Sequence, residues 1–356
     1  MKHASVACGL LTASILISGN ASCQKKTDQG GSSNEVKLHG SGASFPAPLY
    51  NKWFKEYGAA HPDVQVDYQS TGSGQGVTAV IDKTVDFGAS DKAMKQEEMD
   101  KVPGGVQLLP MTAGSIVLAY SVPDVDELKL SREAYAGIFL GTVTKWNDPA
   151  IVKANPGAKL TDMPINVIVR ADSSGTTAVF TKHLSAISKE FAANPSENAM
   201  PNWPVGTKSK GNEGITSSLT TTPGSIGYLE YGYAVKAKLH IAKLENKAGK
   251  FVEPTVASAQ ATLASIELPD NLIAWAPDPV GEESYPIVTY TWVMLYKHYA
   301  DAAKAKALKD AFTWCLGDGQ KESEPLGYIP LPQPVADKAK AALGNIEADG
   351  GSDKKS

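Results

Sequence analysis

The 356-residue sequence predicts an α/β protein with enough apolar material for two globular domains. Short β-rich runs alternate with helical segments from Val36 onward, which is the pattern of α/β folds. Hydrophobic residues make up 42% of the chain and charged residues 20%, so a packed core is expected through most of its length. The net charge of −4 gives no reason to expect nucleic acid or an acidic membrane surface as a partner.

The N-terminus has the pattern of an export signal. A short basic start precedes an apolar stretch from about Val6 to Ile17, which matches the n-region and h-region of a secretory signal. That stretch is too short to span a bilayer comfortably. We expect residues 1–22 to be a signal peptide and residues 23–37 to be a polar linker rich in glycine and serine.

Cys23 follows two small residues and resembles the cysteine of a bacterial lipoprotein, which becomes the lipidated N-terminus. Asn20 stands where lipoproteins have an apolar residue, so simple signal cleavage remains an alternative. Either way the chain is expected outside the cytoplasm, in the periplasm or on the outer face of the cytoplasmic membrane. Cys315 is then left alone in an apolar run, where a core thiol is expected.

The elements follow in order along the mature chain. Strands are expected over 64–68 and 165–169, buried sheet over 116–120 and 287–293, and helices over 49–57, 76–82 and 178–191. The helix over 76–82 is ambiguous because it is short and β-branched. The polar tail, 347–356, is expected to be disordered.

Three turns rich in glycine and hydroxyl residues stand where helices are predicted to begin, at 40–48, 71–76 and 170–177. A helix N-terminus carries unpaired N–H groups and a positive dipole end, so it accepts an anion without a cationic side chain. Glycine lets the backbone approach a ligand, and hydroxyls add donors. Each turn alone is also explained as an ordinary N-cap. If the three converge, they can surround one tetrahedral oxyanion.

Arg170 strengthens the third turn as an anion site. The chain has only two arginines, Arg132 and Arg170, so arginine is not used here as a general surface residue. A planar, always-charged guanidinium suits bidentate binding of an oxyanion. Asp172 follows two residues later and is expected to orient Arg170. The alternative is an exposed salt bridge at a strand end, which contributes little.

Asp91, at the end of the run 85–91, is expected to provide selectivity among anions. Phosphate near neutral pH still carries a proton and can donate a hydrogen bond to a carboxylate, whereas sulfate only accepts and is repelled. Without that context, Asp91 is better explained as the N-cap of a helix beginning at Lys92.

Over about 38–345 the sequence resembles the family of periplasmic phosphate-binding proteins, which are the substrate receptors of high-affinity phosphate ABC transporters. The motifs that carry this resemblance are at 42–48, 85–91, 141–149, 170–176 and 224–228. The resemblance implies a two-lobed periplasmic-binding-protein fold of type II-like topology, with two extended crossovers forming a hinge. They are expected near 109–112 and 284–288, with lobe I over 38–110 and 287–346 and lobe II over 111–286.

Position by position, the resemblance also implies the ligand contacts. The implied phosphate-binding residues are Ser44, Phe45 through its N–H, Ser73, Asp91, Arg170, Ser174, Gly175 and Thr176, with Asp172 behind Arg170. It implies a binding protein and not an enzyme, without a cofactor, that closes on inorganic phosphate and delivers it to ABC permease subunits. A monomer suits that delivery.

Other functions are less well supported by the sequence. An exported phosphatase would use Ser174 as nucleophile, but the mature chain has neither a Gly-x-Ser-x-Gly elbow nor His spacing typical of a metal site. A dinucleotide fingerprint fails at Phe45, where its third glycine is needed. The same fold tuned to another oxyanion is the nearest alternative, and Asp91 is the residue that separates it from a phosphate receptor.

Overall fold

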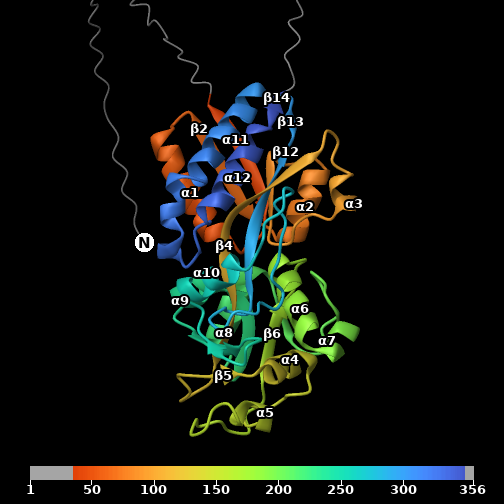
Figure 1. The fold of residues 1–356 in the computed structure, drawn as a ribbon, viewed down its shortest axis with the longest axis vertical. Helices are drawn as coiled ribbons and strands as arrows, with labels where there is room; N and C mark the ends of the chain where they lie inside the picture. The colour runs from red at the N-terminus through yellow and green to blue at the C-terminus, as the bar shows by residue number, and fades with distance from the viewer. Residues whose placement is uncertain (1–34, 349–356) are drawn as a thin grey trace, which may run out of the picture. The chain divides into compact units, whose positions relative to one another are not determined.

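The computed structural model describes residues 35–348, in which nine strands form one curled sheet surrounded by helices (Figure 1). The hydrogen-bonded order of the sheet is β2-β1-β3-β12-β4-β8-β6-β7, with β9 paired to β4. The strands are β1 (Val36–Gly42), β2 (Val64–Ser70), β3 (Phe87–Ser90), β4 (Val106–Ser121), β6 (Asn166–Arg170), β7 (Thr207–Ser209), β8 (Ser225–Glu230), β9 (His240–Ile241) and β12 (Val288–Tyr296).

Helices gather at the two ends of the long strands β4 and β12 (Figure 1). We call lobe I the strands β1, β2, β3 and β12 with their helices, which are α1 (Ala47–Ala60), α2 (Ser73–Ile81), α3 (Gln96–Met99), α11 (Ala302–Cys315) and α12 (Gln333–Gly344). Lobe II contains β6 to β9 with the helices α4 (Arg132–Leu140), α5 (Pro149–Val152), α6 (Gly175–Ile187), α7 (Lys189–Ala193), α8 (Gly211–Thr221), α9 (Tyr231–Lys236) and α10 (Val256–Ala264).

Small elements complete the two lobes. A three-stranded sheet in lobe II is formed by β5 (Lys129–Leu130), β10 (Lys243–Glu245) and β11 (Phe251–Val252). In lobe I, β13 (His298–Tyr299) pairs in parallel with β14 (Glu347–Ala348). The tail expected to be disordered from Glu347 therefore begins with two paired residues, because β13 supplies main-chain partners that a local pattern does not reveal.

The strand β4 links the lobes because its two halves have different partners. From Val106 to Ser115 it pairs antiparallel with β12, and from Ile116 to Ser121 it pairs antiparallel with β8. The change of partner lies a few residues beyond the crossover expected near 109–112. One almost continuously buried strand carries both pairings. The second connection enters β12 at Val288, at the end of the expected crossover.

The predicted helices and strands are present, with shifted ends. The helix expected over 178–191 is two helices, α6 and α7, because Ser188 leaves the helical conformation and caps α7 by accepting the Phe191 N–H. The ambiguous helix over 76–82 is α2, which begins three residues earlier, at Ser73. Asp91 is not a helix N-cap, since α3 begins only at Gln96.

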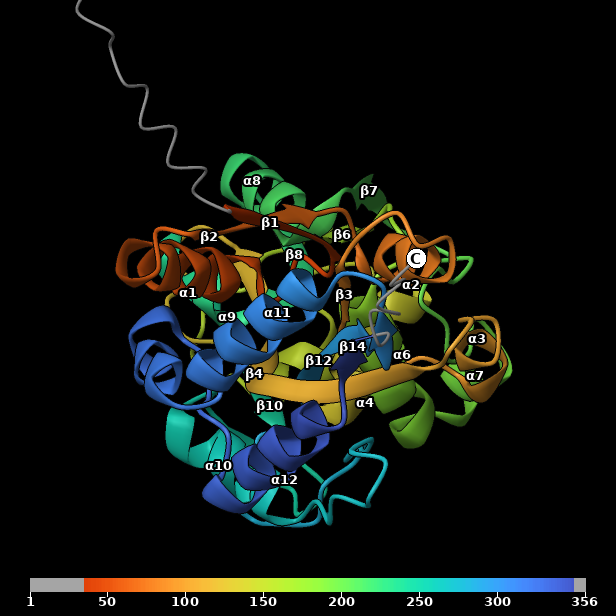
Figure 2. The same ribbon diagram turned by 90° about the horizontal axis from the view of Figure 1, so that it is seen from above.

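The core of lobe I is built on α1, whose buried residues recur at helical spacing and include Leu49, Trp53 and Tyr57. The Trp53 indole N–H donates to the carbonyl of Gly319, which ties α1 to the C-terminal part of the chain. Seen from above, α1, α11 and α12 follow one another over the sheet (Figure 2). This packing fixes the turn between β1 and α1, where the first predicted anion-binding residues lie.

No helix within 35–348 is long and apolar enough to cross a membrane. The expected signal peptide, Cys23 and most of the expected linker lie outside the described residues, as does the tail after Ala348.

Candidate anion-binding site

All eight predicted ligand residues are buried, and hydrogen bonds and close approaches connect them or their immediate neighbours across the two lobes. Seven of them have exposed fractions of 3% or less, and the glycine is buried as well. They stand at or just beyond the carboxyl ends of β1, β2, β3 and β6. Each of these strands pairs in parallel with a neighbour in the sheet. In open α/β sheets that is the edge at which ligands bind.

Arg170 and Asp172 form a buried ion pair at the end of β6. The guanidinium donates from Nε to Asp172 Oδ1 at 2.8 Å and from Nη2 to Asp172 Oδ2. Gly211 N–H also donates to Asp172 Oδ1, at 3.0 Å. Burial opposes the charge of Asp172, but the hydrogen bonds and charge of Arg170 outweigh it and lower the pKa of that carboxyl. Arg170 Nη1 is buried without a partner in the described part of the chain.

Asp91 lies at the end of β3 and accepts two hydroxyl hydrogen bonds. Thr291 donates to Oδ1 at 2.9 Å and Thr176 donates to Oδ2 at 3.2 Å. Burial raises the pKa of Asp91 to about 7, although the Thr291 hydroxyl, the Arg170 charge and the Thr176 hydroxyl act in the opposite direction. Asp91 is therefore a hydrogen-bonded carboxyl group whose charge is finely balanced near neutral pH.

The N-terminus of α6 supplies main-chain donors. Ser174 caps the helix, its Oγ accepting from Thr177 N–H at 3.0 Å. The N–H groups of Gly175 and Thr176 donate to no acceptor within 35–348. A Cβ at Gly175 would overlap Ser73 Oγ and come within 2.8 Å of Asp91 Cβ, so only glycine allows this close approach between the lobes.

The turn after β1 brings Ser44 and Phe45 to the same cluster. Ser44 Oγ accepts from the N–H and from Nδ2 of Asn212, at 3.1 and 2.8 Å. The carbonyl of Phe45 accepts from Tyr328 OH at 2.7 Å, while its own N–H has no protein acceptor in the described part of the chain. Ser73 Oγ, in the first turn of α2, accepts the Asp91 N–H at 3.3 Å.

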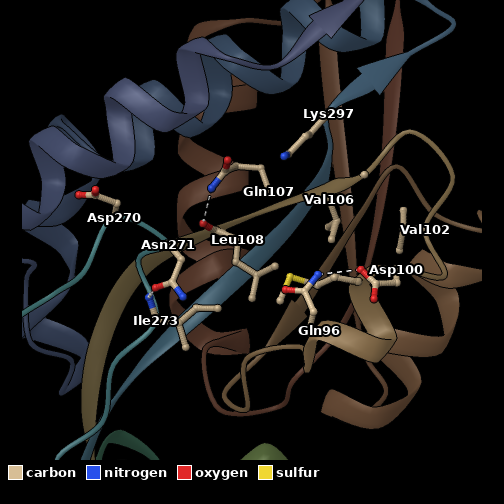
Figure 3. Close-up of a pocket in the computed structure, with 12 residues that line it drawn as sticks. Gln96, Asp100, Val102, Val106, Gln107, Leu108, Asp270, Asn271, Ile273 and Lys297 are labelled. Atoms are coloured by element: carbon tan, nitrogen blue, oxygen red, sulfur yellow. Dashed lines mark hydrogen bonds between the residues drawn. The ribbon is translucent and has the colours of Figure 1, made fainter.

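The site does not coincide with the cavities found near it. A cavity of about 160 Å³ borders it at Ser44 and Asp172, and one of about 320 Å³ borders it at Ser73. A third cavity, of about 460 Å³, lies where β4 begins and is lined by exposed side chains such as Asp100 and Lys297 (Figure 3). None of the predicted ligand residues lines that third cavity. The predicted anion site is thus enclosed between lobes that already touch.

Two residues of the cluster were missed from the sequence. Thr291 is 200 residues from its partner Asp91 and lies in the middle of an apolar strand, so no local signal marks it. Asn212 follows Gly211 at the start of α8, which repeats the pattern of a glycine and a hydrogen-bonding residue before a helix. That pattern was available in the sequence as a fourth turn.

Comparisons with known proteins agree with this geometry. Residues 26–311 match the model of the PBP superfamily domain. A phosphate-binding protein PstS of Xylella fastidiosa (strain Temecula1) is 38% identical, covering 86% of this chain and 84% of that protein. The PstS of Pasteurella multocida is 40% identical, covering 85% of this chain and 89% of that protein. This chain belongs to the PstS family of phosphate-binding proteins.

The PstS family assignment is matched by the fold. The solved structure of PfluDING, a high-affinity periplasmic phosphate-binding protein bound with phosphate, has a TM-score of 0.72 to this chain at 21% identity. It covers 86% of this chain, which covers 93% of that structure. The predicted two-lobed periplasmic-binding-protein fold is thereby confirmed.

The PstS relatives are named as phosphate-binding proteins and not as enzymes. Ser174 Oγ, the nucleophile of the phosphatase alternative, is occupied as the cap of α6. The buried His183 bonds instead to Tyr135 OH and the Pro277 carbonyl. Within 35–348, no histidine is hydrogen-bonded to Ser174.

Proposed function

We propose that this chain binds inorganic phosphate between its two lobes and delivers it, as an exported protein, to an ABC-type importer. Membership of the PstS family supports the ligand, since the relatives carry the name phosphate-binding protein. The site residues of the proposal are those predicted from the sequence, with Asp172 holding Arg170.

One observation carries the proposal: buried donors without protein acceptors gather in this cluster. They are Arg170 Nη1 and the N–H groups of Phe45, Gly175 and Thr176, within the described residues. An unpaired buried donor costs about 1–3 kcal/mol, so several in one place require a common acceptor. A tetrahedral oxyanion with four oxygens satisfies them together.

Asp91 gives the proposed selectivity for phosphate over sulfate. The carboxylate is an acceptor, so it stabilises an anion that still carries a proton and repels one that carries none. The hydroxyls of Thr291 and Thr176 hold its two oxygens in place. Arsenate has the same protonation pattern as phosphate and is expected to bind. A receptor of this fold for molybdate or sulfate would gain nothing from a carboxyl group at this position, because such an anion has no proton to donate to it.

We also assign roles to the N-terminal segment and to the lobe boundaries. Residues 1–22 would direct export, and Cys23, with the linker 23–37, would hold the protein at the outer face of the cytoplasmic membrane. The lobe boundaries near 110 and 287 belong to the same proposal, as does action as a monomer on the permease subunits.

Replacing Arg170 tests the proposed function against a matched control. Arg170→Lys keeps the charge but removes the planar fork, so phosphate affinity should fall about ten- to a hundredfold. Arg132, the other arginine, also forms a bidentate pair, with Asp278, and lies away from the site. Calorimetric titration of phosphate should therefore show wild-type affinity for Arg132→Lys. Equal affinities for wild type and Arg170→Lys would contradict the proposal.

A further inference from the structure

Asn212 is fully buried, and its main-chain N–H and side-chain amide make three hydrogen bonds, two of them to lobe I. Its main-chain N–H and its Nδ2 both donate to Ser44 Oγ, at 3.1 and 2.8 Å. Its Oδ1 accepts from the N–H of Glu230 at 2.9 Å. The Glu230 amide can only donate, so it fixes which end of the Asn212 amide faces Ser44.

The two bonds from Asn212 determine what the Ser44 hydroxyl can do. A serine hydroxyl has one hydrogen to donate and two lone pairs to accept with. Both accepted bonds come from Asn212, so the remaining capacity of the group is its O–H. Within 35–348 that hydrogen has no protein acceptor, and Ser44 is only 2% exposed. The hydroxyl is thus held as a donor in a buried site.

The first turn of α8 holds a second ligand group in the same way. Gly211 has a φ of +68°, a left-handed conformation that favours glycine, and its N–H donates to Asp172 Oδ1 at 3.0 Å. Asp172 in turn holds the Arg170 guanidinium. Two consecutive residues of lobe II therefore reach Asp172 in their own lobe and Ser44 in lobe I.

We propose that Asn212 is a positioning residue for phosphate binding: when the lobes close, its two donors orient the Ser44 hydroxyl so that its hydrogen points to the bound anion. The inference rests on the proposed function, because it assigns a part in that same site. The Ser44 O–H is held in this orientation only when lobe II is docked on lobe I, which makes this contact with the ligand dependent on closure.

An aspartate at this position reverses the chemistry with little change of shape. The carboxylate of Asn212→Asp cannot donate, so the Ser44 hydroxyl would donate to it and be lost to the anion. The added negative charge also disfavours an anion nearby. Asn212→Ala removes one donor and leaves the main-chain bond to Ser44, so its effect should be smaller.

The first experiment is calorimetric titration of the full chain with inorganic phosphate. We expect affinity to fall about tenfold for Asn212→Ala and about a hundredfold for Asn212→Asp. The control is Asn246→Asp. Asn246 is also buried, and its Nδ2 donates to the carbonyls of Gly281, Glu282 and Ser284 within lobe II. The Asn246→Asp variant should lower the thermal midpoint as much as Asn212→Asp does, and its phosphate affinity should stay within about twofold of wild type.

A double-mutant cycle with Ser44→Ala separates positioning from a merely structural role. If Asn212 acts through the Ser44 hydroxyl, Asn212→Ala should change phosphate affinity less than about twofold once Ser44 is alanine. An equal loss in both backgrounds, while wild type binds phosphate, overturns this inference and leaves the proposed function standing. Wild type without phosphate affinity overturns the proposed function and the inference together.

Discussion

Asp91 is surrounded by groups that act on its charge in opposite directions. Burial raises the pKa of the carboxyl to about 7, against the hydroxyl of Thr291 and the charge of Arg170, which lower it. Asp172, already paired with Arg170, is a weaker influence that raises it. The closed lobes therefore enclose a carboxyl group that changes from acid to acceptor near neutral pH, which is the range in which phosphate exchanges its own proton.

The raised pKa of Asp91 should make the free energy of unfolding depend on pH. Asp91 has an ordinary pKa of 3.8, so between about pH 4 and pH 7 the folded form binds more protons than the unfolded form. Its contribution to the free energy of unfolding is full below that window and falls as pH rises through it, by up to about 4 kcal/mol. The free energy of unfolding of Asp91→Asn should therefore rise relative to that of wild type from pH 4 to 7. Above pH 7 the difference between the two proteins should stay constant.

Urea unfolding of both proteins without phosphate, from pH 4 to 8, measures this difference. If the free energies of unfolding of the two proteins differ by the same amount at every pH in this range, Asp91 is not held in the buried environment described here.

The individual site residues could be predicted to different degrees. Arg170 and Asp172 stood out because arginine is rare in this chain and the spacing puts the two side chains together. Thr291 and Asn212 were missed because their partners, Asp91 and Ser44, are 200 and 168 residues away in sequence. Contacts of that separation depend on how β12 and α8 are placed, which no local pattern records.

Among the elements, α6 has the most direct part in the site. It begins immediately after the β6–turn segment that carries Arg170, and its first two N–H groups have no acceptor within the described residues. A helix of 13 residues carries a positive dipole end, which favours an anion at that point. Its first residue, Gly175, also sets how closely the N-terminus approaches lobe I.

Gly175→Ala should weaken phosphate binding through this approach. The new Cβ would overlap Ser73 Oγ and press on Asp91, so the lobes could not close fully, and we expect a loss of about ten- to a hundredfold. Gly344→Ala is the control, since a Cβ at the end of α12 meets nothing within 4 Å. Phosphate titration measures both variants, and unchanged affinity in Gly175→Ala would argue against a site at the start of α6.

The elements themselves could be predicted well where the pattern is local. The stripe of α1 and the strands β2 and β6 were expected within a few residues of their observed bounds. The start of α2 was not, because its first turn depends on tertiary contact: Gly74 N–H donates to the carbonyl of Ser173 in lobe II. The change of partner within β4 was likewise set by the sheet and not by the strand.

At the scale of the whole described unit, hydrogen bonds cross between the lobes on several sides of the site. Gly74 bonds to Ser173, Thr176 to Asp91, and Asn212 to Ser44. The proposed ligand residues are almost completely buried in this arrangement, so an anion would reach them only if the lobes separate. Opening and closing about the strands β4 and β12 is a hinge motion of the kind that encloses ligands in two-lobed proteins.

A ligand can hold the lobes closed only if it binds the closed form more tightly than the open form. In the proposed function, phosphate would satisfy the unpaired donors and donate a hydrogen bond to Asp91, and so favour the closed lobes, whereas sulfate would meet the carboxylate as a second acceptor. A permease that recognises only the closed form would then receive phosphate selectively.

The most direct measurement is calorimetric titration of the anion-free wild-type chain at pH 8 with phosphate and, separately, with sulfate. The account predicts tight one-to-one binding of phosphate and no detectable heat with sulfate. In Asp91→Asn, the difference in affinity between the two anions should be smaller. Absence of phosphate binding, or equal affinity for the two anions, would contradict it.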